Sequence, residues 1–261
     1  MLALSVPRLS PWRSLTLAMA CAAWLFGACG ASVAERDAIK QADYHYQLAA
    51  NHFAAGETTQ AIRELTLSLE QRPDHAEAQH LMGFLYMGRK QYPEAVLHFQ
   101  LALEADPEYY TCLNNLGVAY LYMERWADAI EVYEKLRHAT LYTSPWLAYA
   151  NLGWAYYQLG RIDEGIEQTR MALFLNPEMC LASNNLGIML TEDGQLEEAL
   201  SHFEEAREQC PNYAEPLLHL GQLYAANGQQ RQAKDSFRRC AELSPKSELG
   251  QRCRANAKMY R

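Results

Sequence analysis

Five glycines recur along this 261-residue chain at a nearly constant spacing. They are separated by 34, 36, 34 and 34 residues and stand at Gly83, Gly117, Gly153, Gly187 and Gly221. A fixed period of this length indicates one helical hairpin repeated along the chain, because each unit buries its apolar face against its neighbours instead of in one central core. We therefore expect an all-α solenoid that binds a partner.

The residues that follow each glycine are also periodic. A small residue stands twelve positions later, at Ala95, Ala129, Gly165, Ala199 and Ala233. A larger residue follows four positions further on, at Phe99, Tyr133, Thr169, Phe203 and Phe237. Units often end on proline, at Pro107, Pro177, Pro211 and Pro245. This pattern resembles the tetratricopeptide repeat, in which small residues let two antiparallel helices approach closely and proline ends the second helix.

The resemblance implies a right-handed α-solenoid of six helix-turn-helix repeats. The expected repeats cover residues 42–75, 76–109, 110–145, 146–179, 180–213 and 214–245, the first being a weaker copy with Ala49 in place of the glycine. Residues 246–261 place Leu249, Cys253, Ala257 and Tyr260 on one helical face. We interpret that segment as a capping helix, because the last repeat of a solenoid needs a cover with a polar outer face.

Residues 1–28 differ in kind from the repeats. Arg8 and Arg13 precede an uncharged apolar run that is too short for a membrane span and is typical of a secretory signal. The run ends in LFGAC at residues 25–29, which resembles a bacterial lipobox with Phe26 where an aliphatic residue is preferred. The resemblance implies lipid attachment at Cys29 and a tether over residues 29–41. Cleavage before Cys21, an ordinary signal peptide and an internal membrane anchor stay open as alternatives.

A lipid anchor would decide where the protein lies. Each buried methylene contributes about 0.8 kcal/mol, so several acyl chains hold a protein on a membrane. Gly30 follows the cysteine where an aspartate would signal retention in the inner membrane, so the resemblance implies the periplasmic face of the outer membrane. Loss of residues 1–28 leaves a net charge of −10, which argues against nucleic acid. Basic residues are nevertheless concentrated after Arg231, either as a solvated cap or as a contact for an acidic partner or lipid headgroups.

Five cysteines remain after position 29, and a periplasm keeps suitable pairs oxidised. Cys180 begins the first helix of the fifth repeat and Cys210 ends its second helix. Because these two ends of an antiparallel hairpin lie side by side, we expect a Cys180–Cys210 disulfide worth roughly 3 to 4 kcal/mol. Cys240 faces the cap, so we expect a second bridge, Cys240–Cys253. The alternative is that these cysteines are free and buried.

The first helix of each repeat lines the concave side in the architecture that the motif implies. Inward positions there are apolar, which marks an interaction surface for an amphipathic helix or an extended hydrophobic segment. The predicted groove residues are Tyr46, Phe53, Phe84, Met87, Asn114, Val118, Leu121, Tyr122, Trp154, Tyr157, Asn184 and Ile188. The alternative is a tightly wound superhelix that buries part of this strip against itself.

Asparagine precedes Leu-Gly in three successive repeats, at Asn115, Asn151 and Asn185. Such a ladder resembles those that grip a peptide backbone through side-chain amides, although asparagine also serves structural roles there. A clamp for a free carboxyl terminus would need Lys or Arg beside these residues. None of the inward positions supplies one, so we do not expect capture of chaperone tails.

Catalytic and metal-binding patterns do not occur in the sequence. No nucleophile, base and orienting group stand at a suggestive spacing, and no Gly-rich phosphate loop or close Cys/His cluster exists. We therefore expect a protein that is not an enzyme, with no cofactor, no metal and no small-molecule substrate.

The bridge between the third and fourth repeats narrows the family. The period slips by two residues there, and residues 140–153 read TLYTSPWLAYANLG. With six repeats behind a lipobox, this segment resembles the type IV pilus biogenesis lipoproteins, or pilotins, including the social gliding motility lipoproteins. The resemblance implies a protein that helps the secretin pore reach the outer membrane and multimerise. The alternative is a periplasmic scaffold or regulator of an envelope or peptidoglycan enzyme complex.

Overall fold

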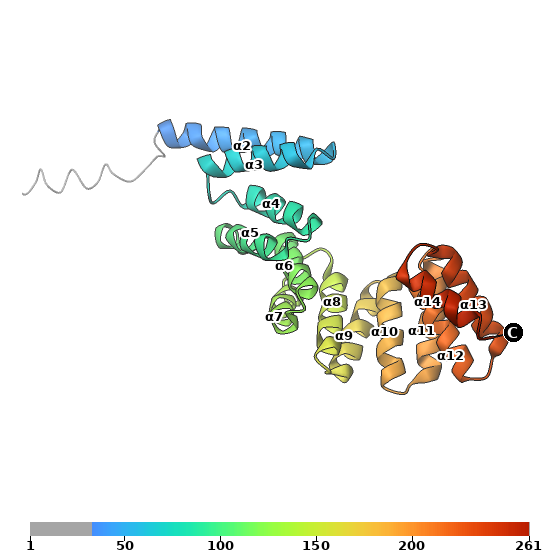
Figure 1. Ribbon diagram of the computed structural model, residues 1–261. Helices are drawn as coiled ribbons and strands as arrows, with labels where there is room; N and C mark the ends of the chain where they lie inside the picture. Colours follow the sequence, from blue (N-terminus) through green and yellow to red (C-terminus); the bar gives the residue numbers. More distant parts are fainter. Residues whose placement is uncertain (1–32, 261) are drawn as a thin grey trace, which may run out of the picture.

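The computed structural model describes residues 33–260, which form thirteen α-helices and no strand. The helices follow one another as an array of antiparallel pairs (Figure 1). The pairs are α2 (Val33–Ala54) with α3 (Thr58–Gln71), α4 (Ala76–Gly88) with α5 (Tyr92–Ala105), α6 (Tyr110–Tyr122) with α7 (Trp126–Arg137), α8 (Pro145–Gln158) with α9 (Ile162–Leu175), α10 (Cys180–Glu192) with α11 (Leu196–Gln209), and α12 (Glu215–Ala226) with α13 (Gln230–Leu243). The predicted all-α solenoid is thereby confirmed. Cys29 and the predicted signal segment lie outside the described residues.

The turn inside each pair reverses the chain through one residue in the left-handed backbone region. Glycine takes that position in four repeats, for example Gly160 and Gly194, where φ is 76° and 83°. Lys90 and Glu124 take it in the second and third repeats, with φ of 59° and 56°. Glycine has no Cβ to clash in this region, so its use at most of the turns favours the tight hairpin.

The periodic glycines lie where the two helices of a pair come closest. A Cβ on Gly117 would lie 2.5 Å from Cζ of Tyr133, and one on Gly221 would lie 2.5 Å from Cε1 of Phe237. The ring sixteen residues later therefore occupies the space that a side chain would need. These glycines are packing residues, because the buried ring fills the gap between the helices.

The fourth repeat replaces that ring with Thr169 and the small alanine with Gly165. The backbones of α8 and α9 consequently approach each other directly. A Cβ on Gly153 would lie 2.8 Å from the carbonyl oxygen of Gly165 and 3.0 Å from the backbone nitrogen of Thr169. This pair is thus closed by backbone contact.

The two additional residues of the long period lie in the loop between α7 and α8. That loop contains residues 138–144, and Tyr142 packs from it against the core cluster of the second to fourth repeats. Leu141 beside it is exposed. The slip in the glycine spacing therefore changes a connection and leaves the helix pairs intact.

The first helix is longer than the sequence analysis expected. We assigned residues 29–41 to a tether, but α2 begins at Val33 and carries helix through the second half of that segment. Ala42 is fully buried, and its carbonyl oxygen accepts a hydrogen bond from Ser68 Oγ on α3 at 2.8 Å. The contact between Ala42 and Ser68 therefore fixes the first half of α2 against α3.

The last helix, α14 (Glu248–Ala257), packs on α13 as a cap. The Ser247 hydroxyl begins the helix by accepting a hydrogen bond from the Gly250 N–H at 3.1 Å, which satisfies one of the unpaired donors of the first turn. Leu249, Ala257 and Tyr260 pack against the core of the last repeats, the face that the sequence pattern indicated.

Both expected cysteine pairs are joined in the structure. The Sγ atoms of Cys180 and Cys210 are 2.07 Å apart, and those of Cys240 and Cys253 are 2.01 Å apart. The first bridge links the two ends of the fifth repeat, and the second attaches α14 to α13. Cys112 is free and buried.

Candidate protein-binding groove

The first helices of the repeats form the inner face of the solenoid. Each first helix contacts the next one along the chain, from α2 with α4 to α10 with α12. Among the described residues, successive second helices make no comparable contact. The first helices therefore lie on the shorter, concave side, as the repeat architecture requires.

The predicted groove residues differ in how accessible the structure leaves them. Phe53, Phe84 and Tyr122 are exposed, and Asn184 is buried. The remaining eight are partly buried: Tyr46, Met87, Asn114, Val118, Leu121, Trp154, Tyr157 and Ile188. Eleven of the twelve residues therefore keep accessible surface, although most of them are partly covered.

Aromatic pairs lie at two places along this strip. Phe53 on α2 meets Phe84 on α4 edge to face, with ring centroids 5.7 Å apart and 84° between the planes. Trp154 and Tyr157 on α8 have centroids 5.2 Å apart. The Tyr157 hydroxyl donates to Glu192 Oε2 at 2.7 Å, and burial and this carboxylate raise the pKa of Tyr157 to about 12. Rings fixed in this way offer apolar area at low entropic cost on binding.

A polar contact joins the second and third repeats. His80 lies 2.9 Å from the Tyr109 hydroxyl through Nδ1 and 2.9 Å from Asn115 Nδ2 through Nε2. One neutral tautomer satisfies both contacts, with Nδ1–H donating to the hydroxyl and Nε2 accepting from the amide. Burial lowers the pKa of His80 to about 4, so the ring stays neutral.

The asparagine ladder is mostly used inside the fold. Asn115 is bound to His80, and Asn151 Nδ2 donates to the Tyr133 hydroxyl at 3.1 Å. These two amides therefore connect repeats through their N–H groups, which is the structural role that the sequence left open for them. Asn185 has no such partner within residues 33–260 and lines a cavity of the groove.

That cavity lies at the carboxyl-terminal end of the groove and has a volume of about 410 Å³. Helices α8 and α10 supply one side of it, with Asn151, Trp154, Asn184, Asn185 and Ile188. Helices α12 and α14 supply the other, with Leu218, His219, Leu249 and Arg252. The cavity therefore brings together the first helices of three repeats and the cap.

Two buried amide oxygens lack a partner along the same face. Asn114 and Asn184 occupy the equivalent position of the third and fifth repeats, three residues before the periodic glycine. The Oδ1 atom of each is buried and accepts no hydrogen bond within the described residues. An unsatisfied buried acceptor costs about 1–3 kcal/mol, so both positions are suited to a donor from a ligand. The position before the ladder therefore carries the buried acceptors without a partner.

Arg252 is the functional candidate that the sequence analysis missed. We excluded a carboxylate clamp because no inward position of the repeats carried Lys or Arg, but α14 brings Arg252 to the cavity that holds Asn184 and Asn185. The signal in the sequence was the basic cluster after Arg231. Periodicity could not place it, because α14 belongs to no repeat.

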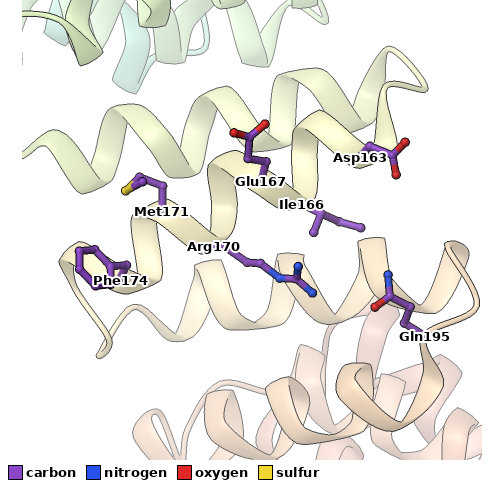
Figure 2. A pocket seen from close by; sticks show the side chains of 7 residues that line it. All are labelled: Asp163, Ile166, Glu167, Arg170, Met171, Phe174 and Gln195. Atoms are coloured by element: carbon purple, nitrogen blue, oxygen red, sulfur yellow. The ribbon is translucent and has the colours of Figure 1, made fainter.

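A second pocket lies on the opposite, convex side. Six of its seven lining residues come from α9 and one, Gln195, directly precedes α11 (Figure 2). Its cation, Arg170, is paired with Glu198, because the Arg170 Nη2 atom donates to both carboxylate oxygens, at 2.8 and 2.9 Å. Met171 and Phe174 are exposed at its edge, the latter by 81%. This pocket contains no buried group without a partner, so the concave groove is the stronger candidate.

No group of His, Cys, Asp or Glu within the described residues could hold a metal ion. Over the same residues, no helix combines the length and apolar character that crossing a membrane requires.

Comparison with known families identifies the repeats. Three sequence-family profiles, each described as tetratricopeptide repeat, match residues 76–109, 114–179 and 178–246. Together they cover more than half of the chain. No curated protein sequence matches it.

Solved structures with a similar fold include a type IV pilus biogenesis factor. PilW, described as a widely conserved type IV pilus biogenesis factor, is 22% identical with a TM-score of 0.72, over 81% of this chain and 97% of that one. PilF of Pseudomonas aeruginosa is 21% identical with a TM-score of 0.71, over 84% and 99%. YrrB, described as having an unusual peptide-binding site, is 22% identical with a TM-score of 0.53, over 73% and 97%. At these identities the similarity shows the fold alone.

Proposed function

Because this chain belongs to the tetratricopeptide repeat family, we propose that it is a non-catalytic scaffold that binds secretin subunits and promotes their multimerisation during type IV pilus assembly. The observation that carries the proposal is the accessible apolar strip along the concave face, from Phe53 and Phe84 to Trp154. The likeness of the array to PilW, which is described as a type IV pilus biogenesis factor, supports a role in pilus biogenesis.

The proposed mechanism is the covering of an apolar segment of an unassembled subunit. An unassembled membrane protein exposes surface that would otherwise aggregate, and a groove of aromatic and aliphatic residues can shield it. We further propose that acyl chains on Cys29 hold the solenoid on the periplasmic face of the outer membrane. Anchoring would raise the local concentration of the bound subunit where the pore forms.

A charge-introducing variant of the groove tests this function. We expect Trp154→Glu with Tyr122→Glu to abolish secretin multimers, because two carboxylates in the strip would have to be desolvated when an apolar segment binds. Phe53→Glu with Phe84→Glu tests the other end of the strip. The matched control is Met171→Glu with Phe174→Glu, which makes the same kind of change on the exposed convex side.

Multimers are measured in outer-membrane fractions, and circular dichroism checks that each variant is helical. Normal multimers with both groove variants folded would refute the role of the groove. Recovery of a peptidoglycan enzyme in place of a secretin, on purification of the wild-type protein, would favour the alternative function.

A further inference from the structure

We propose that the cavity between α8, α10, α12 and α14 is a subsite for a peptide carboxylate that lies next to an apolar residue, with Arg252 of the capping helix as its cation. The inference rests on the proposed function, since it assumes that the groove binds a protein segment. It goes further by assigning the chemistry of one part of that segment.

Arg252 is available to an incoming anion. It makes no ion pair or hydrogen bond within residues 33–260, whereas neighbouring arginines are engaged. Arg254 donates to the Pro245 carbonyl oxygen at 2.9 Å, and Arg239 lies 3.5 Å from the Glu242 carboxylate. Guanidinium groups recognise carboxylates in a two-pronged geometry, which gives direction as well as charge.

Asn184 supplies a second, independent sign that a ligand belongs in the cavity. Its side chain is 1% exposed, lines the cavity and carries the buried Oδ1 atom without a partner. A main-chain N–H of an extended peptide is the donor that such an oxygen lacks. Asn185, the next residue, lines the same cavity and adds an amide that can bind the peptide main chain.

The remaining walls fit an apolar side chain. Trp154 and Ile188 face the cavity from one side, and Leu218 and Leu249 face it from the other. His219 is half-buried and stacks on Phe203 with centroids 5.0 Å apart, and burial lowers its pKa, so it adds no second cation. The Glu215 carboxylate also lines the cavity, where it accepts a hydrogen bond from the Tyr213 hydroxyl at 2.6 Å, and Arg252 is the one arginine or lysine among the lining residues. Arg252 is therefore the cation to which a ligand carboxylate would bind.

The capping helix is fixed beside the cavity by a covalent link. Cys253, the neighbour of Arg252, is bonded to Cys240 on α13 and is fully buried. Leu249, one turn earlier, lines the cavity as Arg252 does. The bridge thus holds one wall of the subsite against the last repeat, and the subsite depends on an element outside the six repeats.

A positional-scanning hexapeptide array tests the inference with the purified full-length protein after signal removal. Each peptide is made in three forms: with Asp or Glu and an amidated end, with Asn or Gln in its place and an amidated end, and with Asn or Gln and a free carboxyl end. We expect peptides with a carboxylate beside an apolar residue to be selected over the neutral form. The first and third forms distinguish a side-chain carboxylate from a chain terminus.

Three variants show which residues carry the preference. Arg252→Gln should weaken binding of the selected peptides about tenfold, the effect of losing one charge-assisted hydrogen bond. Lys258→Gln removes the same charge at the end of α14 that lies away from the cavity, and it should leave peptide binding unchanged. Asn184→Leu should weaken binding and leave the melting temperature unchanged or raised, because it replaces an oxygen that has no partner in the free protein.

The outcomes separate this inference from the proposed function. No carboxylate preference in the wild-type protein, or a preference that survives Arg252→Gln, overturns the subsite. If the groove variants nevertheless abolish secretin multimers, the proposed function stands without it. A carboxylate preference lost in Arg252→Gln, with normal multimers in the groove variants, supports the subsite and refutes the secretin role.

Discussion

Gly153 provides a quantitative test of how the repeats pack. In Gly153→Ala, the new Cβ would lie 2.3 Å from Thr169 Oγ1, 2.8 Å from the Gly165 carbonyl oxygen and 3.0 Å from the Thr169 backbone nitrogen. Two of these three atoms are backbone, so α8 and α9 must move apart. Overpacking of this kind costs about 1–3 kcal/mol, whereas alanine in a helix gains about 1 kcal/mol over glycine. Because the contacts are to backbone, we place the overpacking cost at about 3 kcal/mol. Subtracting the helix gain of about 1 kcal/mol leaves an expected net loss of about 2 kcal/mol.

Gly88→Ala is the matched control. It makes the same substitution at the last residue of α4, where a Cβ would meet nothing within 4 Å, so we expect a gain of about 0.4–1 kcal/mol. Urea unfolding followed by circular dichroism gives the midpoint and slope for each variant. Because solenoids can unfold in parts, a changed slope would show that the repeats no longer unfold together.

The reasoning would be refuted by a Gly153→Ala variant as stable as the parent, or by an equal loss in Gly88→Ala. A loss at Gly153 also bears on the groove. Trp154 is the adjacent residue, so a displaced α8 would move one wall of the cavity.

Two further predictions concern the disulfides and the buried histidine. Replacing Cys180 and Cys210 by serine should cost about 3.6 kcal/mol, and replacing Cys240 and Cys253 about 2.9 kcal/mol, from the chain entropy of their 30- and 13-residue separations. Denaturation of both variants checks that the first loses more stability than the second. Free thiols at these cysteines, found by non-reducing mass mapping of the parent, would contradict the prediction. The pKa of His80 is lowered to about 4, so the unfolded chain binds more protons between pH 6.5 and 4. Stability should therefore fall as the pH drops through that window, and an NMR titration that finds a pKa above 6.5 would exclude this cause.

The periodic residues predict the fold well because each hairpin is closed by contacts that are near in sequence. Gly117 and Tyr133 are sixteen residues apart, and their contact recurs with other rings in other repeats. The cysteine pairs are similarly local, with separations of 30 and 13 residues. The neighbouring ends of an antiparallel hairpin were enough to pair Cys180 with Cys210, and the position of Cys240 beside the cap was enough to pair it with Cys253.

The roles of adjacent asparagines could not be predicted in the same way. Successive helical residues point about 100° apart, so Asn184 and Asn185 lie on different parts of the same helix. Only the rotation of each helix against its neighbours decides which oxygen is buried without a partner and which amide binds another repeat. His80 illustrates the point, because its contact with Asn115 joins positions 35 residues apart.

By itself, the sequence determined the repeat, the helix pairs, the cysteine pairing and the apolar face, because all of these follow from periodic packing inside or between adjacent units. The tertiary structure alone decided that α14 lines one cavity with α8, α10 and α12, and so brings Arg252 and Asn184 to the same cavity. The capping helix belongs to no repeat, so the repeat spacing of the sequence cannot reveal its position. Its place follows from the surface that the last repeat leaves uncovered.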